Sequence, residues 1–466
     1  MADIYIIYST PDRAIAAELA GELSKQWSVR WDDVIVGSFV VAVERELLAA
    51  KVIVPIWSIH SRESDYVRDG LTLAKKNNIV MIPVRVDRCD TPYGFGNLSI
   101  VELGNWQGDS GDPGVRQLMR RIASVVPPQT APARPSQIAD GRLELPTIFM
   151  SVSSHETQLS PIEAVKALRV FKSPTMLISA YDLVPRRIQV EMHEELIRFK
   201  DQGGFILIDS GNYEASRLDD AAWSPDDLAL VLSEVPHDWT FCFDEMNPSA
   251  AVSESADQIV AAVERDRNAT HAPVLPIVHA HKRNGRYAVE EFPAVVREVS
   301  HRLEPPMVAV PERELGSGIM ARAATVRRIR SALADLPFYQ PLHLLGTGNP
   351  WSIAILAAAG ADSFDGLEWC RMIADRNSGR LHHYQHFDLF AYQARLAESP
   401  IAANAVDDDA VEFTGKVAFH NLDFFASFAA ELTRAAGKGG FDAFLTGWLG
   451  QANTRQVRDQ LPGLFG

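Results

Sequence analysis

The sequence predicts two α/β domains in one chain: a flavodoxin-like domain with a five-stranded parallel sheet, followed by a (β/α)8 TIM barrel. The length of 466 residues allows two or three domains at roughly 150 residues each. Apolar runs alternate with amphipathic stretches, which is typical of parallel strands covered by helices on both faces. A segment with five prolines at 126–146 interrupts this alternation. We therefore expect the first domain at 1–126, a proline-rich linker at 127–145, and the barrel with a C-terminal helical tail at 146–466.

The first domain contains five strand-like runs with helix-like stretches between them. The expected strands are 3–9, 28–33, 52–58, 79–87 and 100–106, and the expected helices are 11–25, 38–50, 66–77 and 113–125. Open parallel sheets bind ligands outside the carboxyl ends of their strands. Ser9 and Asp33 stand at the ends of the first two expected strands, so we expect both near the crevice of this domain.

The second domain repeats the alternation eight times. The expected strands are 147–152, 176–180, 205–211, 240–246, 274–280, 307–311, 342–348 and 363–369, with helices at 186–201, 253–265, 287–302, 320–335 and 350–359. Eight such units in about 225 residues have the number and size of a (β/α)8 barrel. A further helix at about 421–437 is expected to pack outside the barrel.

Composition and charge exclude several classes of protein. The chain has 45 basic and 60 acidic residues, and most of the excess lies in residues 128–466, with 31 basic and 44 acidic residues. A broad surface for binding phosphates has the opposite balance. The start MADIYIIYST lacks the features of a signal peptide, and no apolar run approaches the ~20 residues that span a bilayer. The three cysteines are too few and too far apart for a disulfide framework or a cysteine-based zinc site. We expect a cytoplasmic protein with no contact to membranes.

Three carboxylates end three of the expected barrel strands, namely Asp209, Asp244 and Asp365. The carboxyl ends of barrel strands share one face, which is where catalysis takes place. Clustered carboxylates shift one another's pKa, so that one stays ionised while another carries a proton. This pattern suits a nucleophile paired with a general acid or base. The alternative interpretation is that Asp209 and Asp244 cap helices or hold loops.

Four segments of the second domain occur in an order that identifies a known family. They are ILIDSGNYE at 206–214, FCFDEMNP at 241–248, LLGTGNPWSIAILAAAGADSFDG at 344–366 and HNLDFFASF at 420–428. Together they resemble the tRNA-guanine transglycosylase (queuine tRNA-ribosyltransferase) family across about residues 145–455. The resemblance implies a glycosyltransferase that exchanges a purine or 7-deazapurine base at an N-glycosidic bond.

The resemblance also implies roles for single residues. Asp365 matches the nucleophile that attacks the anomeric carbon of the ribose, and Asp209 matches a carboxylate that handles the proton. Asp244 matches the residue that accepts hydrogen bonds from the guanine edge. Tyr213 and Leu345 match the two faces between which the base stacks. The other expected substrate-binding residues are Ser210, His279 and Gly346.

The sequence departs from this family at several positions. Asn212 and Glu214 replace a glycine and a glutamine, and Pro311 stands where the backbone approaches the base. The family's Cys-x-Cys-x-x-Cys…His zinc site is missing, so we expect no metal, and we interpret His382 in HHYQH as part of a polar loop. That region helps the family to hold tRNA. Its absence makes DNA, a free nucleotide or a sugar nucleotide an alternative carrier of the base.

The first domain is similar to Toll/interleukin-1 receptor (TIR) domains across residues 1–125. The resemblance rests on IIYSTPDRAIAAELAGEL, VRWDDVIVGSF and VIVPIWSIHSRESDYVRDGLTLAKKNN. It implies self-association, a homo-oligomer and NAD as a possible ligand. Prokaryotic TIR domains often cleave NAD with a glutamate four residues after the aromatic residue that is Tyr66 here, but Gly70 takes that place. Asp69, one residue before Gly70 and about 100° away around the helix, and Glu63 are the candidates to replace that glutamate.

Three hypotheses follow from the two resemblances. The first is a base-exchange or glycosidic-bond enzyme that uses Asp365 and is assembled or regulated by its TIR domain, with a role in anti-phage (antiviral) defence by analogy of fold. The second is a non-catalytic base or nucleotide sensor coupled to TIR self-association. The third is a TIR NAD glycohydrolase gated by the barrel, which Gly70 disfavours.

Overall fold

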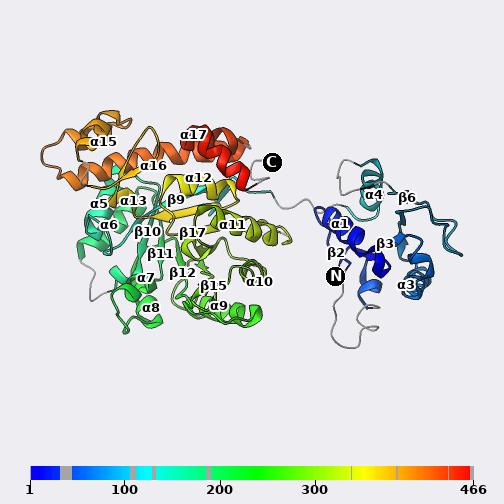
Figure 1. Cartoon of the computed structure of the whole chain (residues 1–466). Coiled ribbons are helices and arrows are strands. Elements are labelled where there is room, and N and C mark those ends of the chain that lie inside the picture. Colours follow the sequence, from blue (N-terminus) through cyan, green and yellow to red (C-terminus); the bar gives the residue numbers. More distant parts are fainter. Residues whose placement is uncertain are drawn as a thin grey trace. The chain divides into compact units, whose positions relative to one another are not determined.

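The computed structural model describes residues 2–31, 45–104, 106, 112–127, 133–184, 190–336, 338–384, 387–438 and 440–461. The chain divides into two compact units, Met1–Ala131 and Pro132–Gly466 (Figure 1). Within the described residues, no helix has both the length and the apolar character needed to cross a membrane.

The first unit is built on a parallel sheet with the strand order β2-β1-β3-β5-β6, and β4 also pairs with β3. Its strands are β1 (Ile4–Ile7), β2 (Val29–Arg30), β3 (Val52–Trp57), β4 (Val80–Met81), β5 (Val84–Arg85) and β6 (Val101–Glu102). The strand expected at 79–87 forms as β4 and β5, which continue in one register along β3. The break falls at Pro83, because proline has no N–H to donate to the neighbouring strand. The predicted parallel sheet is confirmed.

Helices α1 (Arg13–Leu23), α3 (Asp65–Lys76) and α4 (Pro113–Ala123) accompany this sheet. Side-chain caps start two of them: Ser64 accepts a hydrogen bond from the N–H of Val67, and Asp112 accepts from the first turn of α4. Separate apolar cores lie on the two faces of the sheet. Of the helix expected at 38–50, residues 45–49 are helical, and the earlier residues lie outside the described part.

The second unit is a barrel of eight parallel strands in the order β13-β12-β11-β10-β9-β18-β17-β16. The strands are β9 (Thr147–Val152), β10 (Thr175–Ser179), β11 (Phe205–Asp209), β12 (Trp239–Phe241), β13 (Val274–Leu275), β16 (Val308–Pro311), β17 (Leu342–Leu345) and β18 (Ser363–Gly366). The N–H of Val278 donates to the carbonyl of Ala309 (2.8 Å), and the N–H of Ala309 donates to the carbonyl of Pro276 (3.0 Å). These bonds join the two edge strands and close the barrel, which confirms the predicted fold class.

Helices surround the barrel strands, as expected for strands that are buried on both faces. They are α5 (Pro161–Phe171), α6 (Val190–Asp201), α7 (Asn212–Arg217), α8 (Pro225–Glu234), α9 (Val252–Asp266), α10 (Phe292–Leu303), α11 (Ile319–Leu333) and α12 (Pro350–Ala358). The helix expected from 287 begins at Phe292, because two short antiparallel strands, β14 (Lys282–Arg283) and β15 (Arg286–Tyr287), precede it.

Part of the segment expected to be a linker belongs to the barrel unit. The strands β7 (Gln137–Ile138) and β8 (Leu143–Glu144) form an antiparallel hairpin. Leu143 is buried in the core inside the barrel, together with side chains such as Phe149 and Phe205. The extended linker expected up to residue 145 is therefore corrected: its second half is an ordered hairpin, because Ile138 and Leu143 find an apolar surface to pack on.

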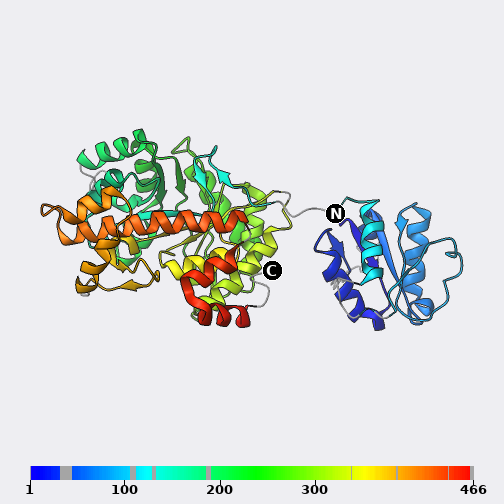
Figure 2. The same cartoon turned by 90° about the horizontal axis from the view of Figure 1, so that it is seen from above.

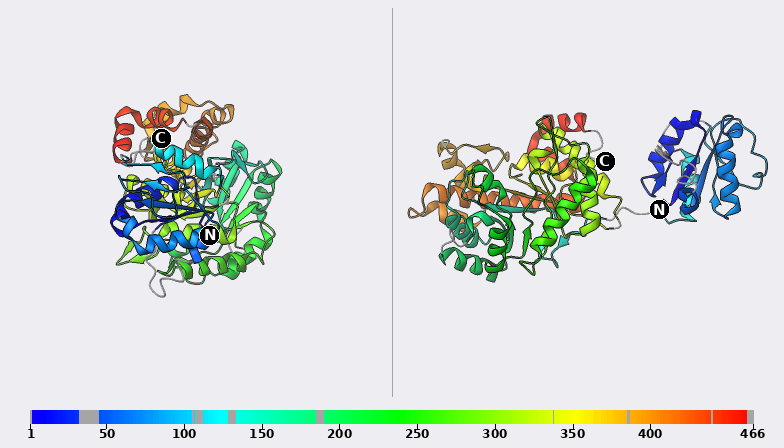
Figure 3. Two further views of the ribbon diagram at one scale, coloured as in Figure 1. Left: turned by 90° about the vertical axis from the view of Figure 1, so that its right-hand side faces the viewer. Right: turned by 90° about the horizontal axis from the view of Figure 1, so that it is seen from below.

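The remaining helices are α13 (Glu368–Arg371), α14 (Phe387–Gln393), α15 (Pro400–Asp407), α16 (Phe413–Lys438) and α17 (Phe441–Gln460). The helix expected at 421–437 is the second part of α16, which runs along the barrel unit in Figure 2. Together with α17 it lies on one side of the barrel (Figure 3, left). Phe424, Phe425 and Phe428 of α16 are buried against the barrel core.

Candidate active site

A pocket of about 240 Å³ opens at the carboxyl ends of the barrel strands. The eight barrel residues expected to form the site all line it: Asp209, Ser210, Tyr213, Asp244, His279, Leu345, Gly346 and Asp365. The barrel thus brings together residues that are up to 156 positions apart in the chain. Further lining residues that sequence reasoning did not assign to the site include Ser151, Ser153, Ser179, Glu156, Arg313 and Arg371.

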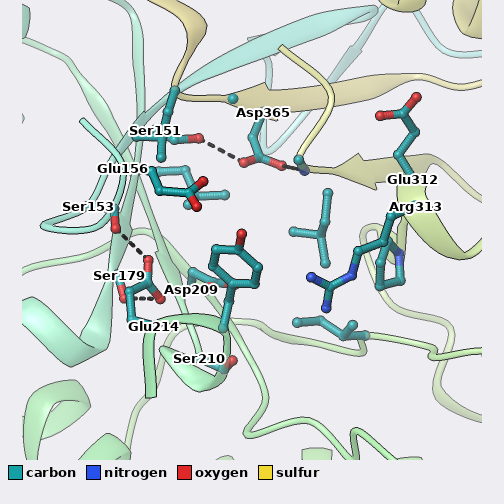
Figure 4. A pocket seen from close by; sticks show the side chains of 18 of the residues that line it. Ser151, Ser153, Glu156, Ser179, Asp209, Ser210, Glu214, Glu312, Arg313 and Asp365 are labelled. Atoms are coloured by element: carbon teal, nitrogen blue, oxygen red, sulfur yellow. Dashed lines mark hydrogen bonds between the residues drawn. The ribbon is translucent and has the colours of Figure 1, made fainter. Parts of the chain in front are cut away.

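Asp365 is fixed by three donors. Its Oδ2 accepts a hydrogen bond from the hydroxyl of Ser151 (2.7 Å), and its Oδ1 accepts from the N–H of Gly346 (2.8 Å) and from Nε2 of His343 (3.2 Å). Gly346 has φ +73°, a left-handed conformation that glycine adopts without strain. The Nδ1 atom of His343 lies 2.7 Å from the hydroxyl of Ser363. When His343 is neutral, this hydroxyl donates to Nδ1 and leaves Nε2–H for Asp365. The carboxylate therefore has one defined orientation at the edge of the pocket (Figure 4).

Asp209 ends β11 and faces the same pocket. Burial raises the pKa of Asp209 well above its usual range, and the negative charges of Glu214, Asp244 and Asp365 raise it further. One weak hydrogen bond, from the N–H of Gly211 to Oδ2 (3.4 Å), opposes this shift. The side chain is therefore suited to carry a proton at a pH at which an ordinary aspartate is ionised.

Glu214 forms a second acidic centre beside Asp209. It accepts hydrogen bonds from the hydroxyls of Ser153 (2.6 Å) and Ser179 (2.9 Å), and Figure 4 shows it between these two serines. Burial raises the pKa of Glu214, and the charge of Asp182 adds to this effect, against the two serine hydrogen bonds. The sequence marked Glu214 only as a departure from a family pattern. The serines stand at inward positions near the ends of β9 and β10, the same strand-end signal that identified Asp209.

Asp244 is held by a buried histidine that bridges two carboxylates. Nε2 of His279 lies 2.6 Å from Oδ2 of Asp244, and Nδ1 lies 3.0 Å from Oε1 of Glu314. Burial lowers the pKa of His279, but the hydrogen bonds to both carboxylates outweigh it and raise that pKa to about 10. Burial raises the pKa of Asp244, but His279, Ser210 and Asn212 outweigh it, so that this pKa lies below its usual value.

Replacing His279 by glutamine is expected to destabilise the barrel by about 3–5 kcal/mol, because it leaves two buried carboxylates without their cation. His281→Gln is the matched control, since His281 makes one hydrogen bond, to the carbonyl of Pro248. The measurement is urea unfolding of the barrel transition at pH 7. A loss of unfolding free energy in H279Q no larger than that in H281Q would contradict the charged bridge.

The stability that the bridge contributes should be complete below about pH 6.5 and should be lost as the pH rises through about 10.

Tyr213 lines the pocket, and two guanidinium groups lie near its ring. Those of Arg217 and Arg313 lie 5.3 and 5.2 Å from the centroid of its ring. Arg313 points into the pocket in Figure 4. It belongs to a 3-10 helix, η4 (Glu312–Glu314), at the end of β16, where the sequence departs from the family. Leu345 lines the same pocket, so Tyr213 and Leu345 are both available to contact a planar ligand.

The candidate residues of the first unit do not come together in this way. Ser9 is buried, and its hydroxyl donates to the carboxylate of Asp12. Glu63 and Asp69 are exposed, and Asp33 lies outside the described residues. A Cβ atom on Gly70 would lie 3.1 Å from Cδ1 of Ile7 and 3.4 Å from Cδ1 of Leu47. The position of the missing glutamate therefore faces apolar side chains.

Comparisons with known proteins agree with both resemblances. The TIR domain family model matches residues 4–119, so the chain carries a TIR domain, as its motifs predict. The chain is also similar to the tRNA-guanine(15) transglycosylase of Methanopyrus kandleri, with 23% identity over 239 residues (49% of each chain). Identity to the tRNA-guanine(15) transglycosylase of Nanoarchaeum equitans is 23% over 227 residues (49% of this chain and 53% of that protein). The chain thus spans about half the length of these relatives.

Proposed function

From a TIR domain followed by a transglycosylase-like barrel, we propose that this protein exchanges a purine or 7-deazapurine base at an N-glycosidic bond. The observation that carries the proposal is the pairing of two aspartates with different environments in one pocket. Three donors orient Asp365, whereas burial and neighbouring charges raise the pKa of Asp209. Two carboxyl groups whose environments differ in this way can serve as nucleophile and proton carrier.

The reaction balances with these two side chains alone. A carboxylate oxygen of Asp365 forms a bond to C1′ of the ribose while the bond from C1′ to the base breaks. Asp209 donates its proton to the departing base. The incoming base then gives a proton back to Asp209, and its ring nitrogen bonds to C1′ and releases Asp365. Asp209 thus acts as acid in the first half and as base in the second.

The pocket supports a planar base with hydrogen-bond donors on its edge. Tyr213 and Leu345 offer apolar contact surfaces, and contact with an aromatic ring contributes about 1–3 kcal/mol per base. Asp244 is a fixed acceptor with a lowered pKa. A base without matching donors would leave this acceptor partly unpaired, which disfavours its binding. In this proposal the carrier of the base is a nucleic acid or a nucleotide.

The TIR domain is proposed to assemble or regulate the enzyme through contacts with other TIR domains, in a homo-oligomer. Two observations support a role other than NAD cleavage: Gly70 packs near Ile7 and Leu47, and Asp69 and Glu63 are exposed. A role in anti-phage defence would follow from coupling such assembly to a base-modifying barrel, by analogy of fold.

The proposal is tested by incubating the full chain with labelled guanine or labelled 7-deazaguanine and separate pools of tRNA, DNA and nucleotides. Label is expected to enter one pool with the native chain and none with Asp365→Asn. That result would establish exchange and name the carrier. Absence of label from every pool, with a folded native chain, would contradict exchange of these bases.

A further inference from the structure

Several basic side chains follow neighbouring barrel strands at their carboxyl ends, and one of them, Arg313, lines the pocket, which is otherwise rich in carboxylates. Arg217 lies in α7 after β11, and Arg313 lies in η4 after β16. Lys282 and Arg286 lie in the β14–β15 hairpin after β13. The strands β11, β12, β13 and β16 follow one another round the closed barrel. These four side chains therefore belong to one arc of the catalytic face.

The hairpin is a short and well-defined projection. Its turn residues Asn284 and Gly285 both have positive φ angles, 52° and 75°, as two-residue hairpin turns of type I′ require. Lys282 and Arg286 are exposed, and the Lys282 ammonium lies 5.2 Å from the centroid of the Tyr287 ring. His279, which lines the pocket, is three residues before Lys282. The hairpin thus begins at the mouth of the site.

Charge on this arc is only partly neutralised. Among the described residues, Lys282, Arg286 and Arg217 have no ion-pair partner within 4.0 Å, whereas Arg313 lies 4.0 Å from Glu314. Arg283 in the same hairpin pairs with Glu291 at 3.1 Å. An exposed acid, Glu245, stands at the end of the intervening strand β12. The cations in excess on this arc therefore remain available to an anionic partner.

The arc also combines its cations with aromatic rings. Arg217 and Arg313 pack on the ring of Tyr213, and Lys282 packs on the ring of Tyr287. Alternating cations and aromatic rings are how proteins bind single-stranded nucleic acid, with phosphates on the cations and bases on the rings. A base that reacts inside an enclosed pocket must also leave its stack, which is easiest in a single strand.

We propose that this basic arc, Arg217, Lys282, Arg286 and Arg313 with Tyr213 and Tyr287, holds the phosphodiester backbone of a single-stranded nucleic acid whose base enters the pocket. The inference rests on the proposed base exchange and names the carrier of the base. It places nucleic-acid binding in a local feature of a chain whose overall charge is negative.

The test measures fluorescence anisotropy of labelled single-stranded DNA and RNA oligonucleotides, and of a duplex of the same sequence, with the full chain over a range of salt concentrations. The variant K282Q/R286Q is expected to bind about tenfold more weakly, and its salt slope should fall by about 1.4, the value for two lost phosphate contacts. The matched control is K172Q/R267Q. It removes the same charge from two exposed residues at the C-terminal ends of α5 and α9, away from the catalytic face.

The oligonucleotide that binds more tightly, DNA or RNA, would identify the sugar of the carrier. Binding of either oligonucleotide that K282Q/R286Q weakens would support the proposal. Equal affinities of K282Q/R286Q and K172Q/R267Q for both would overturn it, as would tighter binding to a duplex. Because binding is measured without any free base, failure of the arc is distinct from failure of base exchange.

Discussion

Replacing Asp365 by asparagine is expected to lower the rate of base exchange by about a thousandfold or more, because the covalent step loses its nucleophile. Asparagine has the same shape and can still accept from the N–H of Gly346, which reaches the native carboxylate at 2.8 Å. The fold should therefore persist. The measurement is the initial rate of label incorporation, with circular dichroism and the melting temperature as checks of folding.

Asp335→Asn is the matched control for this change, since Asp335 is exposed and lies just after the C-terminal end of α11, away from the catalytic face. It should exchange bases at the native rate. An Asp365→Asn protein that is folded and retains a rate within tenfold of the native one would contradict the assignment of the nucleophile.

Replacing Asp209 by asparagine is expected to lower exchange by about 10²–10⁴-fold, the usual contribution of a positioned acid or base. The pKa of Asp209 is raised by burial and then by Glu214, Asp244 and Asp365. Release of the first base requires the protonated form, so its rate in the native chain should fall as the pH rises through this raised pKa. Single-turnover release measured over the pH range in which the native chain stays folded should show that fall in the native chain and a flat profile in the variant. A fall of the same size in both would contradict the role.

The same substitution has an expected effect on stability. When the pKa of an aspartate is higher in the folded state than in the unfolded state, the protein loses stability as the pH rises from the unfolded-state pKa, about 3.9, towards the folded-state pKa. The melting temperature of Asp209→Asn relative to the native chain should therefore be higher at pH 8 than at pH 5. A difference that does not grow with pH would contradict a buried, protonated Asp209.

The sheets and the eight strands of the barrel could be predicted because buried parallel strands are nearly continuous apolar runs. The strand-end rule then placed Asp209, Asp244 and Asp365 in one pocket. The serines that hold Asp365 and Glu214 were missed because a serine at a strand end is a common polar residue there and does not by itself indicate a site. Their significance depends on which carboxylate faces them across the barrel.

Local sequence was a weaker guide where tertiary contacts decide the conformation. Prolines indicated a linker up to residue 145, but the β7–β8 hairpin forms because Leu143 packs into the barrel core. The turn Asn284–Gly285 is a strong hairpin signal just before the helix expected from residue 287, but no hairpin was expected there. Gly70 was identified as a missing glutamate, but only the structure places it against Ile7 and Leu47.

The most direct test of this account is the detection of the covalent intermediate. The full chain is mixed with the nucleic acid that accepts label, without any free base, then quenched with acid, digested with protease and nuclease, and measured by mass spectrometry. A peptide that contains Asp365 is expected to carry the mass of one ribosyl or deoxyribosyl residue with its phosphates, and Asp365→Asn should carry none. Label exchange by the native chain with no adduct on any peptide, or with an adduct on another carboxylate, would contradict Asp365 as the nucleophile.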